Sequence, residues 1–102
     1  MKYTFVLQWP ASSMGDYDSM IAIEGLLVST LSKSSNVDGH DTGAGETNIF
    51  IDTDDPTALY EEIRSVLGSH GAWSDIRVAY RNVEGGPYTV LWPKSLRDFR
   101  VR

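Results

Sequence analysis

A stretch of eleven residues holds most of the side chains that could do chemistry. From Asp38 to Asn48 it contains one imidazole, three carboxylates, one carboxamide and three glycines. A histidine beside carboxylates can act as a general base or a metal ligand, and glycine lets the backbone approach a ligand. Candidate binding residues are therefore Asp38, His40, Asp41, Glu46 and Asn48. The alternative is a polar hairpin, since Asp and Asn also favour turns.

Glu24 is a further candidate because of its place in a predicted helix. Glu24 falls inside the stripe of apolar residues that recur over 16–32 with helical spacing: Tyr17, Met20, Ile21, Leu27, Val28 and Leu31. A buried carboxylate needs a partner. We therefore expect Glu24 to lie close to the hairpin from His40 to Asn48 and to share a hydrogen-bonded network with it. The alternative is an edge position, with the stem packed and the carboxylate in water.

Common metal and cofactor motifs are absent from the sequence. A calcium-binding loop starting at Asp38 would need a glutamate where Ile49 stands, and the lysine of a phosphate-binding loop is missing. Two histidines and no cysteine are too few for a typical zinc site. The dinucleotide-binding glycine pattern is also missing. We expect no metal and no cofactor, and the sequence identifies no catalytic residue.

Periodic segments predict the elements that position these residues. Strands are expected at 3–9, 37–45, 46–53, 76–82 and 88–92, and helices at 16–32 and 56–67, with Asp16 and Asp55 as N-caps. The order β, α, β, β, α, β, β predicts an α+β fold. The expected architecture is a ferredoxin-like βαββαβ sandwich with an extra C-terminal strand, an antiparallel sheet and two helices on one face. It forms a single domain, 1–102, in which 93–102 is a basic C-terminal tail.

Two helices on one face leave the other face of the sheet uncovered. Phe and Tyr side chains on an open face must be covered by a partner, a ligand or the tail. We therefore expect either a homodimer or a tail folded over this face, with Leu96 and Phe99 as anchors.

The net charge of −5 is unevenly distributed. Residues 1–63 hold two basic and eleven acidic residues, whereas residues 64–102 hold seven basic and three acidic ones. This balance argues against nucleic acid as a partner, because phosphate binding needs a basic face. Either the two halves neutralise each other across the fold, or the acidic half recruits a basic protein partner.

No apolar run approaches the roughly 18 residues of a membrane span, and the N-terminus lacks the pattern of a signal peptide. The absence of cysteine fits a reducing compartment. We interpret the chain as cytoplasmic, with no membrane partner.

One run also resembles a known group of proteins. Residues 39–50 read Gly-His-Asp-x-Gly-x-Gly-Glu-x-Asn-x-Phe, and the chain later contains Thr-x-Asp-Pro at 53–56 and Trp-Pro at 92–93. In these features it resembles a group of small uncharacterised bacterial proteins, over nearly its whole length. The group has no established activity, so the resemblance implies no function.

Two hypotheses about function follow from the sequence. The first is a small non-enzymatic protein-interaction module, immunity-protein-like in character or self-associating through its open sheet face. The alternative is a small enzyme or ligand-binding domain with a site at Glu24 and the hairpin from His40 to Asn48. Convergence of these side chains on one pocket would favour the alternative.

Overall fold

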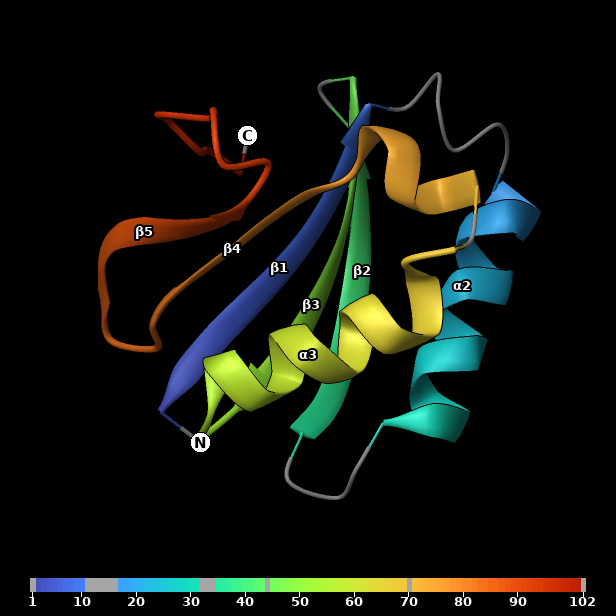
Figure 1. Cartoon of the computed structure of the whole chain (residues 1–102), viewed down its shortest axis with the longest axis horizontal. Coiled ribbons are helices and arrows are strands. Elements are labelled where there is room, and N and C mark those ends of the chain that lie inside the picture. The colour runs from blue at the N-terminus through green and yellow to red at the C-terminus, as the bar shows by residue number, and fades with distance from the viewer. Residues whose placement is uncertain (1, 11–16, 32–34, 44, 70, 102) are drawn as a thin grey trace.

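The computed structural model describes residues 2–10, 17–31, 35–43, 45–69 and 71–101. Within these ranges the elements are β1 (Tyr3–Pro10), α2 (Tyr17–Thr30), β2 (Ser35–Gly43), β3 (Glu46–Thr53), α3 (Pro56–Leu67), the 3₁₀ helix η1 (Gly71–Asp75), β4 (Arg77–Asn82) and β5 (Gly85–Trp92). The strands form one sheet in the order β2-β3-β1-β4-β5, and all neighbours are antiparallel (Figure 1). The predicted α+β class, with an antiparallel sheet and two helices, is confirmed.

The central strand β1 is buried on both faces. Its alternation places Phe5, Leu7 and Trp9 on one face and Val6 and Gln8 on the other, and all five are at most 1% exposed. A strand buried on both sides must be covered by two separate layers. The helices form one layer and the C-terminal segment forms the other.

Both helices pack on the same face of the sheet, as Figure 1 shows. They share one hydrophobic core with the sheet, which is formed by Met20, Ile23 and Leu27 of α2, Leu59, Ile63 and Leu67 of α3, and Phe5, Leu7, Trp9, Ile49, Ile51 and Val78 of the strands. The start of α3 is the predicted one: Pro56 is its first residue, and the Ala58 amide donates to Asp55 Oδ1 at 3.0 Å. The N-cap expected at Asp16 lies outside the described residues.

The apolar stripe predicted for α2 is wrong at two positions. Ile21 is 38% exposed and Val28 is 64% exposed, whereas Ile23 is buried. Met20, Ile23 and Leu27 follow the i, i+3, i+7 spacing of a single helix face. The helix is therefore rotated from the predicted orientation, and this rotation keeps Glu24 at the edge of the buried stripe.

The second face of the sheet is covered by the chain's own C-terminal segment. Phe99, which is 7% exposed, packs with Val6 and Ala79, and Phe50, Tyr88, Val90, Leu96 and Val101 pack around them. Gln8 Nε2 also donates to the Arg100 carbonyl at 2.7 Å. The tail thus closes the face that was expected to be open, by way of both predicted anchors.

Two elements differ from the prediction. β5 begins at Gly85 instead of residue 88, because Gly85 and Gly86 adopt φ of 119° and 92° and still allow Asn82 to pair with Gly85. η1 was not predicted at all, and it carries Trp73. Within the described part of the chain, neither α2 nor α3 has the length and apolar character needed to cross a bilayer.

Candidate functional site

Glu24 and His40 form a close polar contact that joins α2 to the edge strand β2. His40 Nδ1 lies 3.0 Å from one carboxylate oxygen of Glu24 and 3.2 Å from the other. The side chains are half-buried, with 28% of His40 and 18% of Glu24 exposed. The contact confirms the expectation that Glu24 lies close to His40.

The chemistry of this pair follows from its geometry. A carboxylate bound to one ring nitrogen fixes the orientation of an imidazole, which is the arrangement used in proton transfer and in metal ligation. The same contact also has a structural use, because it satisfies a carboxylate beside the hydrophobic core.

Substitution of Glu24 separates shape from charge at this contact. We expect Glu24→Gln to change the free energy of unfolding by less than about 1 kcal/mol, since a carboxamide can still bond the imidazole. Glu24→Ala should cost more, because it removes one hydrogen-bond partner of a half-buried histidine. Urea denaturation of the two variants beside the parent protein measures the difference, and equal stabilities for all three would show that the contact adds nothing.

Asn48 lies on the other face of the sheet, so the expectation that it shares a network with Glu24 is wrong. In register, His40 pairs with Ile49 and Asp41 pairs with Asn48. Adjacent residues of a strand point to opposite faces. Asn48 is 1% exposed, and its Oδ1 accepts from Gln8 Nε2 at 3.0 Å, under the C-terminal segment.

The remaining candidates also divide between places. Asp38 and Asp41 are exposed on the edge strand β2, and Asp38 lies at a register shift between Val37 and Gly39. Glu46 is half-buried and lines a pocket of about 320 Å³ with Arg77, Asp98 and Arg100. The candidate residues therefore do not converge on one site.

A metal centre finds no support in these positions. Among the residues whose structure is described, no group of three or more His, Cys, Asp or Glu side chains is arranged to hold a metal ion.

A cluster of aromatic rings beside α3 was missed by the sequence reasoning. The rings of Tyr60 and Trp73 have centroids 6.3 Å apart, and those of Trp73 and Trp92 are 5.8 Å apart. Tyr3 and Tyr80 meet edge to face at 5.6 Å. All five side chains are half-buried. We call Tyr3, Tyr60, Trp73, Tyr80 and Trp92 the aromatic face.

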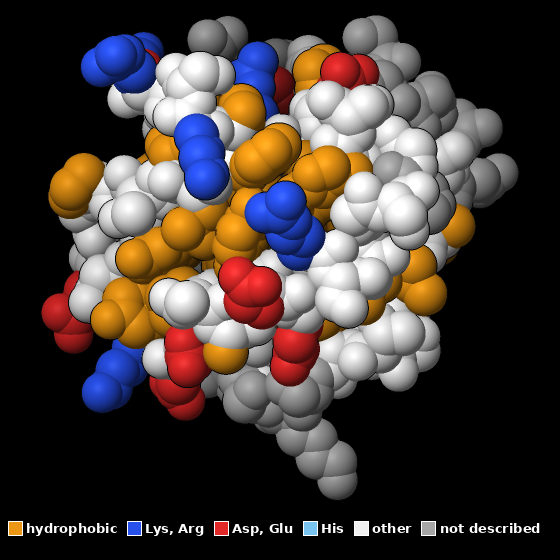
Figure 2. Space-filling model, in the orientation of Figure 1, with side chains coloured by type: hydrophobic (Ala, Val, Ile, Leu, Met, Phe, Trp, Pro, Cys, Tyr) orange, Lys and Arg blue, Asp and Glu red, His pale blue; other side chains and the backbone are white. Residues whose placement is uncertain are grey.

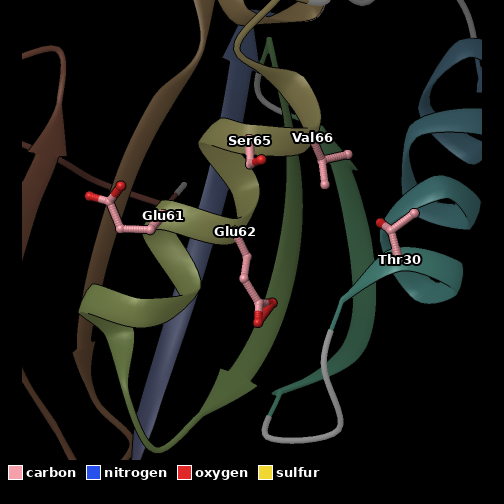
Figure 3. A pocket seen from close by; sticks show the side chains of 5 residues that line it. All are labelled: Thr30, Glu61, Glu62, Ser65 and Val66. Atoms are coloured by element: carbon pink, nitrogen blue, oxygen red, sulfur yellow. The ribbon is translucent and has the colours of Figure 1, made fainter.

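The other flank of α3 carries a shallow groove toward α2. Its volume is about 500 Å³, and it is lined by Thr30, Glu61, Glu62, Ser65 and Val66, which we call the acidic groove. Figure 3 shows Val66 and Thr30 facing each other from the two helices. An aliphatic side chain beside carboxylates suits the stem and charge of a lysine or arginine.

Comparison of the chain with family models, with curated proteins and with solved structures gives no match. The resemblance to small uncharacterised bacterial proteins therefore stays a prediction.

Proposed function

We propose that this chain is a small non-enzymatic module that binds a basic protein partner through the surface around α3. The observation that carries the proposal is the aromatic face. It supplies an apolar contact area, and the acidic side chains around it supply complementarity to a basic partner.

The composition of the aromatic face is that of a protein-binding surface. Tryptophan, tyrosine and arginine dominate the energetics of protein interfaces, and here the guanidinium of Arg64 lies 5.5 Å from the centroid of the Trp92 ring. Figure 2 shows hydrophobic side chains exposed in a band across this side of the molecule, bordered on its lower side by acidic side chains. Bands of this kind mark contact sites on small proteins.

The charge of the adjoining elements favours a basic partner. Residues 54–63, which include the first half of α3, contain four acidic residues and no Lys or Arg. The Glu24–His40 contact and the Asp98–Arg100 ion pair each lie within one half of the chain, so neither neutralises one half against the other. Arg64 and Arg81 instead lie over the rings of Trp92 and Tyr88. Such asymmetry steers association with a positively charged protein.

Charge reversal on α3 tests the proposal. Proteins that bind to the immobilised chain and are released by salt are identified first. The purified partner protein is then titrated by calorimetry against the parent chain and against its variants. We expect a partner of net positive charge, and a dissociation constant at least tenfold weaker for Glu61→Lys. Trp73→Ala, with its fold checked by circular dichroism, should weaken binding similarly because it removes an aromatic anchor.

Asp41→Lys is the matched control, because it makes the same charge change on the opposite face of the sheet. Binding within twofold of the parent is expected for this variant. Equal weakening by Asp41→Lys and Glu61→Lys would reduce the interaction to non-specific charge attraction and contradict the proposal, as would a partner of negative charge. Self-association through the sheet face is the less favoured mode, because Phe99 and its neighbours occupy that face.

The alternative of a small enzyme or ligand-binding domain at Glu24 and the hairpin has one supporting observation, the oriented His40. It has no support from Asn48, which lies on the other face.

We also propose that the fold is ferredoxin-like, extended by β5. The central position of β1 and β3, the placement of β2 and β4 outside them and the packing of both helices on one face support this assignment. Such a fold hosts many functions and does not select among them.

A further inference from the structure

A pocket on the tail-covered side of the sheet holds charges that do not neutralise one another. It spans three neighbouring strands, because Glu46 pairs with Pro10 on one side of β1 while Arg77 pairs with Gln8 on the other. Asp98 and Arg100 of the C-terminal segment form its remaining wall, and its volume is about 320 Å³. With two carboxylates and two guanidinium groups, its lining has no net charge.

Only one ion pair forms among these four side chains. Arg100 Nε donates to Asp98 Oδ2 at 3.0 Å in an exposed ion pair. Glu46 Oε1 is buried and accepts no hydrogen bond, and among the described residues Arg77 has no ion-pair partner. Among the described residues neither Glu46 nor Arg77 forms an ion pair, and both line the same small space.

The backbone of this pocket is held by a buried polar contact. Gln8, which is 1% exposed, lies between Asn48 and Arg77 in register and donates through Nε2 to Asn48 Oδ1 and to the Arg100 carbonyl. This contact ties β3 and the C-terminal segment to β1. Gln8 Oε1 is, like Glu46 Oε1, buried without a donor. Buried acceptors are normally satisfied by protein groups or by ordered water, so the polar groups beside the pocket are not all paired within the described part of the chain.

We propose that this pocket binds a small zwitterion that carries a primary ammonium and a carboxylate, such as a free amino acid. The ammonium donates to the half-buried carboxylate of Glu46, and the ligand's carboxylate accepts from the guanidinium of Arg77, which is suited to bind it through two parallel hydrogen bonds. The volume admits only a small ligand. The neutral balance of the lining disfavours ligands with a large net charge, and the charged walls disfavour apolar ones.

Amide chemical shifts recorded by NMR during ligand titration test the proposal. The probes are glycine, β-alanine and 4-aminobutyrate, whose charges are separated by increasing lengths, with acetate and methylamine as the two single charges. At least one zwitterion is expected to shift the signals of residues 46, 77 and 100 saturably. Acetate and methylamine should bind at least tenfold more weakly, because each satisfies only one end of the pocket.

Three variants locate the binding. Glu46→Gln and Arg77→Gln should each weaken it at least tenfold. Arg81→Gln should leave it unchanged, since Arg81 lies on the same face of β4 but over the ring of Tyr88. Arg77 is exposed, so its replacement tests the pocket even if the Glu46 variant unfolds. Equal binding of acetate and the zwitterions, saturable shifts with none of them, or unchanged binding by Arg77→Gln would each overturn the proposal.

Discussion

Truncation of Leu27 or Ile63 to alanine is expected to lower the free energy of unfolding by about 2–5 kcal/mol. Each side chain is 0% exposed, and they join the same core from different helices, Leu27 from α2 and Ile63 from α3. The loss combines the transfer energy of the deleted methyl groups with that of the cavity left behind. Urea denaturation followed by tryptophan fluorescence measures it, since the chain contains three tryptophans.

Val28→Ala is the matched control on α2. Val28 is 64% exposed, so its truncation should change the stability by no more than about 0.5 kcal/mol. A loss below about 1 kcal/mol for Leu27 or Ile63, or a loss at Val28 as large as theirs, would show that the buried faces of the helices are assigned wrongly.

The elements could be predicted where a local signal is strong. The alternation from Tyr3 to Trp9 specifies a strand whichever face is buried, and Asp55 before Pro56 marks a helix start through a single side-chain contact. The rotation of α2 is different in kind. Ile21, Ile23 and Val28 are all apolar, and the choice of which to bury depends on where β2 and α3 lie. Periodicity within the helix does not contain that information.

The candidate site was predictable only in its Glu24–His40 contact. A carboxylate inside an apolar stripe must find a donor, and the helix that carries it packs beside the strand that follows it. The proximity of residues along the chain then misled the prediction for Asn48. It lies eight residues from His40, but pairing and alternation place it on the other face.

The aromatic face and the mixed-charge pocket needed the tertiary structure. The aromatic rings come from β1, α3, η1, β4 and β5, so no local spacing connects them. In the same way, Glu46 and Arg77 line one pocket only because β3 and β4 flank β1. Surfaces assembled from single residues of many elements leave no motif in the sequence.

Truncation of Phe99 is the second substitution with a large expected effect. Phe99 is 7% exposed, packs on Val6 and Ala79 and lies 4.9 Å from the ring of Tyr88, between centroids. It is the largest apolar side chain that holds the C-terminal segment, whose described residues 93–101 form no helix or strand. We expect Phe99→Ala to cost about 3–5 kcal/mol of the free energy that docks this segment.

Detachment should expose the apolar face of the sheet beneath. We therefore expect Phe99→Ala to bind a hydrophobic dye such as anilinonaphthalene sulfonate, and to sediment as a larger species at high protein concentration, because an uncovered face of this kind associates with another. Side-chain amide protons of Gln8 should also exchange faster, since their bond to the Arg100 carbonyl depends on the docked segment.

Arg97→Ala separates loss of the apolar anchor from loss of charge in the same segment. Arg97 is exposed, so this variant should keep the stability, the dye response and the sedimentation of the parent protein. If Phe99→Ala behaves as Arg97→Ala does, the segment does not close the sheet. If both variants bind the dye, the segment is held by charge, and the apolar contacts of Phe99 with Val6 and Ala79 are not what seals this face of β1.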